Sequence, residues 1–302
     1  MVENVHKIDF FIAINNQLIK LMNLFWKEMV FGGHLFAVGS VAVILVCATL
    51  FRVHVGLDIL FCSYLLFYAI YLYDYLQGVS SDELTNSSRA RYLRSKHKAM
   101  CTVLITSVLL VALLLLFANI VTTFIGISIL VLGLFYGSYF KKITKMIPAF
   151  KNFFVSFVWS FMVLFVFIYY SLPITYGALM LALFIFIRMM NIQILFDVRD
   201  AESDRKDGLL TIPALFSDRQ YPFILRSVNS LSILFVTVCV ILGLLPLLTL
   251  AVIPMFYYAA TYINNVLKCK KNYSSYVFAA CEPIMWSVLI FAGQYITMLG
   301  IL

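Results

Sequence analysis

Nine apolar stretches, each close to the length of a membrane span, follow one another along the chain of 302 residues. About 20 apolar residues in a helix cross the hydrocarbon core of a bilayer, so each stretch predicts one transmembrane helix. The composition agrees, because 63% of the residues are hydrophobic and only 12% are charged, which excludes an ordinary soluble domain. We place the spans at about residues 29–51, 56–77, 99–118, 120–140, 152–171, 174–196, 222–244, 247–267 and 276–299.

The basic residues predict the orientation of these spans. All Lys and Arg residues except Arg52 and Arg188 lie before the first span or in the loops near residues 89–98, 141–151, 199–226 and 268–271. By the positive-inside rule, the N-terminus and these four loops are cytoplasmic and the C-terminus is outside. The net charge of +8 then matches anionic membrane lipid, and we expect no nucleic-acid partner.

Residues 1–28 form a separate N-terminal segment in this interpretation. Their apolar residues recur at helical spacing, and Lys7, Lys20 and Lys27 make the polar face basic. This pattern is typical of an amphipathic helix that lies in the membrane interface. A soluble first turn packed on the bundle is the alternative. Residues 29–302 are then a single transmembrane domain.

An acidic stretch follows the sixth span. Asp197, Asp200 and Asp204 are three and four residues apart, so a helix places all three on one face. Like charges at the end of a membrane span require a compensating cation. Mg²⁺ prefers oxygen ligands and is usually held by one or two carboxylates plus phosphate oxygens. The alternative is a solvated acidic loop, neutralised by its basic neighbours.

A second acidic region follows the second span and is less regular. Asp82 comes eight residues after Asp74, and Asn86 and Arg89 follow at intervals of four and three. If Asp74 ends one helix and Asp82 begins another turn, the carboxylates close on one metal while Arg89 meets phosphate oxygens. The alternative is that Asp82 is a helix cap.

The two acidic regions belong to a faint internal repeat. Asp74 and Asp197 each end a predicted span and are 123 residues apart, and Trp159 and Trp286 are 127 apart. This spacing predicts two four-helix units, spans 2–5 and 6–9, in addition to the first span. Two acidic loops that face each other across the mouth of a bundle would form a diphosphate site.

Two polar residues lie inside the sixth span. Arg188 and Asn191 are three residues apart on one face of an apolar segment, and an intramembrane charge usually faces a cavity or a partner. We expect them to line the substrate pocket. The alternative is that Arg188 forms an internal pair with Glu282 of the last span.

Two motifs connect the sequence with a known family. The stretch from Asp197 to Gly208, with Thr211 and Pro213 after it, resembles the second aspartate-rich motif of the UbiA superfamily of intramembrane prenyltransferases. The segment Tyr136-Gly-Ser-Tyr-Phe-Lys141, followed by Lys151-Asn152, resembles the tyrosine and lysine segment of that family. The first acidic region departs from the family pattern Asn-x-x-x-Asp-x-x-x-Asp and is similar to a divergent branch.

The resemblance implies an all-α bundle that moves a prenyl group from a polyprenyl diphosphate, such as geranyl or geranylgeranyl diphosphate, to a lipophilic or aromatic acceptor in the membrane. It also implies two Mg²⁺ ions, which stabilise the charge that develops on the departing diphosphate. We expect Asp197, Asp200 and Asp204 to hold one ion and Asp74 and Asp82 the other. The catalytic residues are then Asp74, Asp197, Asp200 and Lys141, and the substrate contacts are Asn86, Arg89, Tyr139, Lys141, Arg188, Asn191, Arg199 and Lys206.

A transporter, or an isoprenoid-binding protein without catalysis, is the alternative function. Transporters built from repeats keep their polar groups near the midplane of the membrane. In this chain the acidic residues gather at the predicted cytoplasmic ends of the spans, and only Glu282 lies deep in one. The enzyme interpretation is therefore favoured.

Overall fold

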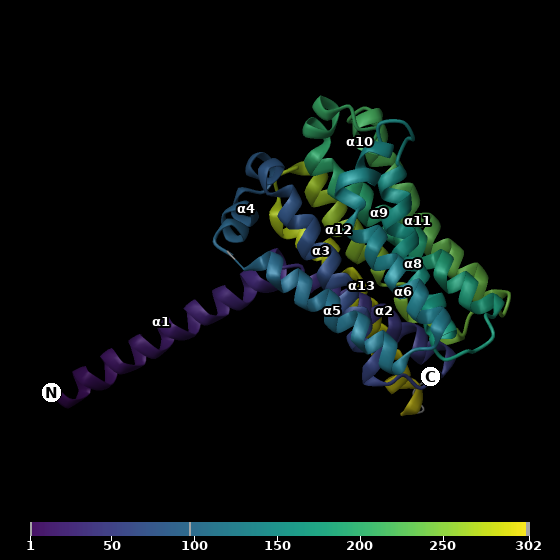
Figure 1. The fold of residues 1–302 in the computed structure, drawn as a ribbon, viewed down its shortest axis with the longest axis horizontal. Coiled ribbons are helices and arrows are strands. Elements are labelled where there is room, and N and C mark those ends of the chain that lie inside the picture. Colours follow the sequence, from purple (N-terminus) through teal and green to yellow (C-terminus); the bar gives the residue numbers. More distant parts are fainter. Residues whose placement is uncertain (1, 97, 300–302) are drawn as a thin grey trace.

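The computed structural model describes residues 2–96 and 98–299, and all its regular elements are helices (Figure 1). The side chains of residues 1–14, 81, 84, 138, 140 and 141 lie outside the described part. Within that part, eight helical segments are long and apolar enough to cross a membrane. They are α2 (His34–Phe51), α3 (Leu57–Thr85), α5 (Ala99–Phe117), α8 (Phe150–Tyr169), α9 (Tyr176–Asp207), α11 (Gln220–Ile241), η2 with α12 (Leu247–Val252 and Met255–Lys268) and α13 (Tyr273–Met298).

The segment predicted as a span at 120–140 differs from the others. Helix α6 (Ile120–Leu134) has 15 residues and is followed by a π-helical turn, η1 (Tyr136–Phe140), and by α7 (Lys141–Ile143). At 1.5 Å per residue α6 extends about 22 Å, which is less than the roughly 30 Å of the hydrocarbon core. The all-α membrane bundle is confirmed, whereas the count of nine spans and the two-unit repeat stay predictions.

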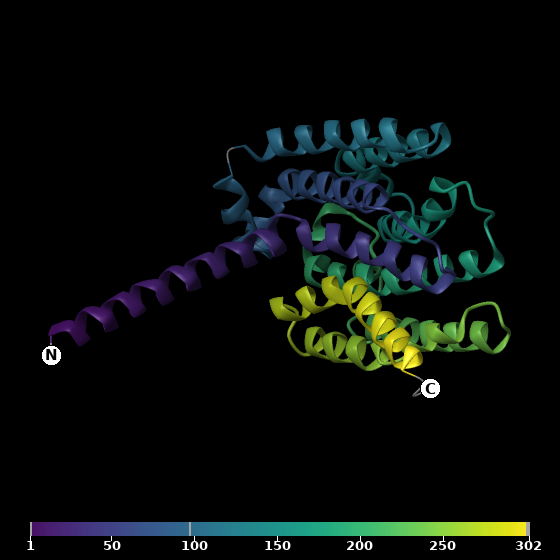
Figure 2. The same ribbon diagram turned by 90° about the horizontal axis from the view of Figure 1, so that it is seen from below.

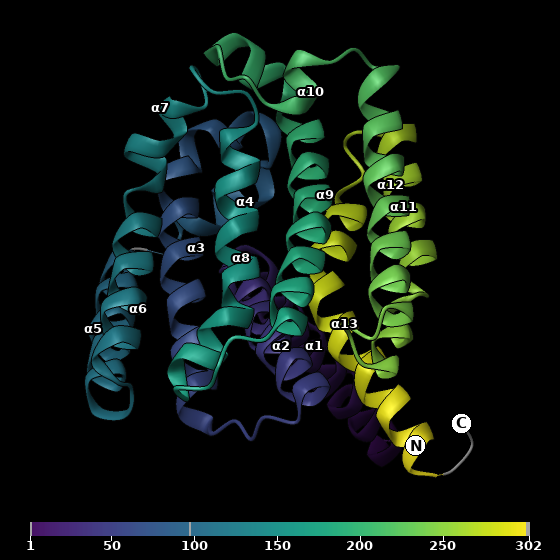
Figure 3. The same cartoon turned by 90° about the vertical axis from the view of Figure 1, so that its right-hand side faces the viewer.

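The long helices run side by side (Figure 3). Helix α2 packs against α3, α8 and α13, and α8 packs along α9. The two largest buried side chains, Trp159 and Trp286, lie in α8 and α13 and are each 1% exposed. Large apolar side chains such as Leu104 and Leu116 of α5 stay exposed, as expected of groups that face lipid hydrocarbon.

Helices α3 and α9 extend beyond the predicted spans and carry the two acidic regions. The condition that Asp74 ends one helix and Asp82 begins another turn is not met, because α3 continues without a break to Thr85. The chain turns instead at Asn86, whose side-chain oxygen accepts a hydrogen bond from the Arg89 amide and so caps α4 (Ser87–Arg94). Helix α9 ends at Asp207 and is capped by Gly208, whose φ of 70° is readily adopted only by glycine. The short helix α10 (Ile212–Leu215) follows.

Helix α1 (Val2–Phe31) leaves the bundle as a separate rod (Figure 2). Between residues 15 and 27 every side chain is exposed, including Phe25 and Trp26 beside Lys20 and Lys27. Exposed apolar and basic side chains on one helix are compatible with the expected position in the membrane interface. The boundary between residues 1–28 and the bundle stays a prediction.

Glu28 connects the base of α1 to the bundle. His34 Nε2 lies 3.3 Å from Glu28 Oε1, and Tyr92 and Lys96 both donate hydrogen bonds to the carboxylate. The hydrogen bond with His34 is the largest cause that lowers the pKa of Glu28 from 4.5 to about 2, and Lys96 and Tyr92 add to it. The ionised carboxylate therefore holds α1 and α2 to α4 and to the segment that follows α4.

We expect Glu28→Gln to lower the thermal unfolding temperature at pH 7 by a few degrees. Because the folded-state pKa is depressed, the stabilisation by Glu28 is complete above pH 4.5 and is lost as the pH falls toward 2. The difference in unfolding temperature between the wild type and the variant should therefore shrink over that range. Thermal unfolding in detergent at several pH values measures it, and a difference that does not depend on pH would contradict the assignment.

Candidate functional site

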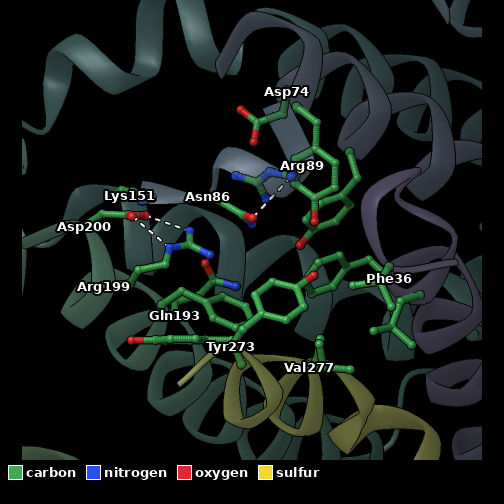
Figure 4. A pocket seen from close by; sticks show the side chains of 17 residues that line it. Phe36, Asp74, Asn86, Arg89, Lys151, Gln193, Arg199, Asp200, Tyr273 and Val277 are labelled. Atoms are coloured by element: carbon green, nitrogen blue, oxygen red, sulfur yellow. Dashed lines mark hydrogen bonds and ion pairs between the residues drawn. The ribbon is translucent and has the colours of Figure 1, made fainter. Parts of the chain in front are cut away.

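Three cavities meet inside the bundle, and Asp74 and Lys151 line all of them. The mouth cavity, of about 220 Å³, is lined by polar residues that include Gln77, Asp82, Arg89, Tyr136, Asp200 and Asp204. The tyrosine cavity, of about 170 Å³, is lined by residues that include Phe36, Tyr75, Asn86, Arg89, Gln193, Arg199, Asp200, Tyr273 and Tyr276 (Figure 4). The inner cavity, of about 100 Å³, is lined by mainly apolar residues that include Phe67, Ile70, Tyr71, Gly133, Tyr136, Phe154, Val158, Trp159 and Gln193.

Lys151 lies in the first turn of α8 and is held by α9. Its Nζ donates to Asp197 Oδ1 at 2.7 Å, and Asn152 Nδ2 donates to Asp197 Oδ2, also at 2.7 Å. Asp197 is fully buried and both its oxygens are engaged, whereas the Lys151 side chain remains 24% exposed. Asp197 therefore anchors Lys151, and the ammonium group faces the junction of the cavities.

The other two aspartates of α9 line the mouth cavity, as their spacing predicts. Asp200 accepts two hydrogen bonds of 2.9 Å from Arg199, and Asp204 accepts one of 2.9 Å from Thr211. The loop that contains Thr211 is fixed in turn, because Leu210 pairs through its backbone with the loop before α8. In the second acidic motif, the Asp197 carboxylate is thus buried and bonded to α8, whereas the carboxylates of Asp200 and Asp204 line the mouth cavity.

In the first acidic region, two predicted site residues pair with each other. Arg89 donates two hydrogen bonds of 2.6 Å to Asp82, and its guanidinium lies 4.2 Å from the centre of the Tyr75 ring. Asn86 caps α4 and also lines the tyrosine cavity. Figure 4 shows Asp74 and Arg89 across the pocket from Arg199, Asp200 and Lys151. The two acidic regions therefore do converge on one space.

The oxygen groups around the mouth cavity fit Mg²⁺ bound together with phosphate. In the described residues, no group of three His, Cys, Asp or Glu side chains is arranged to hold a metal by itself. However, the Tyr136 hydroxyl, which borders the mouth cavity, is buried without a hydrogen-bond partner in that part of the chain. Because Mg²⁺ usually takes only one or two carboxylates and completes its shell with water and substrate phosphates, a preformed protein cage is not required.

Three other predicted substrate contacts lie elsewhere or cannot be placed. Lys206 is exposed and pairs with Glu202 at 3.3 Å, and Tyr139 is 63% exposed. Neither residue lines any of the three cavities. The side chain of Lys141 lies outside the described part of the chain. Lys151, in contrast, lines all three cavities.

Arg188 and Asn191 are buried in the bundle and line none of the three cavities. Arg188 donates to Glu282 at 2.6 Å, and it also donates to Asn229 and Ser232. Tyr262 and Trp286 complete the hydrogen bonds to Glu282. The structure thus favours the internal pair over a substrate contact for Arg188. Both amide atoms of Asn191 lack a hydrogen-bond partner within the described residues.

We expect Glu282→Gln to destabilise the protein by about 3–5 kcal/mol, because it leaves the Arg188 guanidinium buried and uncompensated. The double variant Arg188→Met/Glu282→Met should recover most of that loss, since both charges are gone. Unfolding in detergent measures both effects. If the single variant unfolds like the wild type but no longer binds a prenyl diphosphate, Arg188 belongs to the substrate site after all.

Two residues that the sequence interpretation did not assign to the site are central to it. Lys151 belongs to the lysine segment that resembles the family and carries a charge at the start of an apolar span, and both were available signals. Gln193 is 6% exposed, lies one turn before Asp197 and lines both the tyrosine and the inner cavity. Figure 4 shows it in the wall of the pocket. Its polarity within the sixth span was the only local signal.

Comparisons with known proteins agree with this architecture. A model of the UbiA prenyltransferase family matches residues 79–281. The chain is similar to the apo structure of a UbiA homologue from Aeropyrum pernix K1, with 17% identity, a TM-score of 0.66 and coverage of 87% of this chain and 98% of that one. It is also similar to a digeranylgeranylglyceryl phosphate synthase, with 14% identity, a TM-score of 0.53 and coverage of 89% and 95%. These two likenesses concern the fold. No curated protein sequence matches the chain.

Proposed function

The chain belongs to the UbiA prenyltransferase family, and from this premise we propose that it transfers a prenyl group from a polyprenyl diphosphate to a lipophilic or aromatic acceptor within the membrane, with Mg²⁺ as cofactor. The observation that supports the proposal most strongly is the junction at Asp74 and Lys151. There, a cavity lined by carboxylates and cations adjoins a mainly apolar cavity inside the bundle, and the two share Asp74, Tyr136 and Lys151 as lining residues. A diphosphate with a hydrocarbon tail has the same division into charged and apolar parts.

The residues around the mouth cavity have distinct roles in this proposal. Asp74, Asp200 and Asp204 would hold two Mg²⁺ ions together with the phosphate oxygens of the donor. Ions bound there would neutralise the charge that develops on the leaving diphosphate. Lys151 and Arg89 bind the remaining phosphate oxygens, and arginine suits this role because its planar fork matches phosphate geometry.

The reaction breaks the bond between the allylic carbon and the diphosphate oxygen, and the electron pair leaves with that oxygen. An electron pair from the acceptor then forms the new bond to carbon, and the acceptor releases a proton to the diphosphate or to water. The inner cavity takes the first part of the prenyl chain and excludes water from it. The acceptor occupies the tyrosine cavity. Gln193 and Tyr71 line both this cavity and the inner cavity, so an acceptor bound there lies next to the first part of the prenyl chain.

Two further residues position the phosphate-binding cations. Asp197 holds Lys151 at 2.7 Å, and Asp82 holds Arg89 through two bonds.

The mouth cavity and the N-terminus are on the cytoplasmic side in this proposal, which the distribution of basic residues supports. Water-soluble or short-chain donors then reach the mouth from the cytoplasm, while the acceptor enters from the bilayer.

The test is Mg²⁺-dependent binding of geranylgeranyl diphosphate by the purified protein and release of diphosphate from it. We expect Asp74→Asn and Lys151→Met each to slow release at least about 100-fold, the loss typical of removing one group that stabilises developing charge. Asp218→Asn is the matched control, because Asp218 pairs with Lys270 at the surface, its side chain is 69% exposed and it lines none of the cavities.

Binding without turnover in the presence of Mg²⁺ and a range of acceptors would point to the alternative function, an isoprenoid-binding or transport protein. Binding that neither Mg²⁺ nor the two site variants affect would contradict the proposed site itself. A wild type and Asp218→Asn that release diphosphate equally, with both site variants inactive, is the result that the proposal predicts.

A further inference from the structure

Helix α1 presents two opposite faces between residues 15 and 27. Polar residues recur at intervals of four and three along one face, which consists of Asn16, Lys20, Asn23 and Lys27. The opposite face is apolar and consists of Leu18, Leu21, Met22 and Phe25. All these side chains are exposed, and residues 15–27 contain two lysines and no acidic residue. An apolar face backed by a basic polar face matches the surface of a bilayer that contains anionic lipid.

The direction of α1 agrees with this partner. Figure 1 shows α1 extending away from the bundle, across the direction of α5. A helix with that direction lies along the membrane surface while α5 spans the membrane. Trp26 lies between the two faces of α1 and is 53% exposed, and tryptophan is enriched where membrane meets water. A second α1 could cover the apolar face, but its residues 15–27 offer no negative charge to Lys20 and Lys27.

The last turn of α1 belongs to the wall of the tyrosine cavity. Val30 lines that cavity, and the Phe31 ring lies 5.7 Å from the ring of Tyr273, which also lines it. Gly32 and Gly33 then join α1 to α2, and the φ of 88° at Gly33 is readily adopted only by glycine. Two consecutive glycines at this point form a hinge at which α1 can change its direction.

Glu28 connects α1 to a second wall of the same cavity. Its carboxylate accepts a hydrogen bond from Tyr92 of α4. Arg89 precedes Tyr92 by three residues on α4, and both Arg89 and the capping residue Asn86 line the tyrosine cavity. A movement of α1 therefore reaches the cavity through Phe31 on the side of α13 and through Glu28 on the side of α4.

We infer that an anionic bilayer surface binds α1 and that this contact keeps the tyrosine cavity closed on the side of α1. While α1 lies on the bilayer, Val30 and Phe31 stay in the cavity wall. When α1 leaves the bilayer, it turns at Gly32 and Gly33 and the wall opens. In the proposed function, on which this last step rests, the cavity holds the acceptor, so anionic lipid retains the acceptor and excludes water.

The fluorescence of Trp26 tests the contact with lipid. The chain has three tryptophans, and the other two, Trp159 and Trp286, are each 1% exposed. The protein is placed in nanodiscs of phosphatidylcholine, or of an equal mixture with phosphatidylglycerol, whose brominated acyl chains quench tryptophan on contact. The difference in quenching between the wild type and Trp26→Phe isolates the signal of Trp26. We expect this difference to be larger in the anionic mixture.

Two pairs of substitutions separate the charge on α1 from charge in general. Lys20→Gln/Lys27→Gln should lower the quenching in the anionic mixture to its value in phosphatidylcholine, because the basic face is lost. Lys142→Gln/Lys145→Gln is the matched control, since it removes two exposed lysines from the segment before α8. The control should be quenched like the wild type.

The labelling rate of the variant Val277→Cys tests the coupling to the cavity. Val277 lines the tyrosine cavity on α13 (Figure 4). The variant also carries serine in place of the native cysteines that are exposed or half-buried, which are Cys101, Cys269 and Cys281. The reagent is 2-hydroxyethyl methanethiosulfonate, which is neutral, so lipid charge does not change its concentration at the membrane.

We expect Val277→Cys to react about tenfold more slowly in the anionic mixture than in phosphatidylcholine. The attraction of two lysines to an anionic surface can shift the equilibrium between bound and released α1 by up to about 30-fold. Adding Lys20→Gln/Lys27→Gln should abolish the difference. A protein that retains only Cys269 among the accessible thiols is the reference, because Cys269 is exposed and lines none of the cavities, so its rate corrects for the effect of surface charge on a thiol.

Each outcome decides one part of the inference. Trp26 fluorescence that brominated lipid does not quench overturns the contact of α1 with the bilayer. Quenching together with a corrected labelling rate that is equal in both membranes overturns the coupling to the cavity. Neither result affects the proposed function, because neither measurement uses a prenyl diphosphate. A protein that shows both effects but releases no diphosphate contradicts the proposed function and leaves the role of α1 intact.

Discussion

The ion pair between Lys151 of α8 and Asp197 of α9 is the interaction on which the candidate site depends. Two charges inside a helical bundle are costly to remove from water, and such a pair is tolerated only where geometry and further hydrogen bonds are favourable. Asn152 supplies the second bond to Asp197, so the carboxylate is satisfied and fully buried. Lys151 keeps part of its surface open to all three cavities. The bundle thus presents a fixed positive charge where charged and apolar spaces meet.

The remaining charges of the site follow a similar arrangement. Arg89 is paired with Asp82, and Arg199 is paired with Asp200, each through two hydrogen bonds. Each guanidinium also lies over a tyrosine ring, Tyr75 in the first case and Tyr276 in the second. These pairs keep the carboxylates and cations balanced within the bundle. In the proposed function, the diphosphate brings negative charge and its metal ions bring positive charge. The site already contains cations for the diphosphate and carboxylates for the metal ions.

Much of this organisation follows from local patterns in the sequence. Apolar length predicts the spans, and the spacing of Asp197, Asp200 and Asp204 predicts a shared helix face because a helix has a fixed period. The exact roles depend on neighbours that are distant in the chain. Nothing local shows that Asp197 is anchored by Lys151, and the sequence offers the contact of Arg188 with Glu282, 94 residues later, only as one of two alternatives. The position of the break after α3 also could not be read locally, because the capping of α4 by Asn86 sets it and a charged Asp74 is tolerated within a continuous helix.

The central claim is that a diphosphate binds where Asp74 and Lys151 meet. The most direct measurement is an experimental structure of the protein with Mg²⁺ and geranylgeranyl thiolodiphosphate. We predict density for the diphosphate in the mouth cavity, within hydrogen-bonding distance of Lys151, and for the first isoprene unit in the inner cavity. A diphosphate bound away from Asp74 and Lys151, or a tail that avoids the inner cavity, would contradict the account.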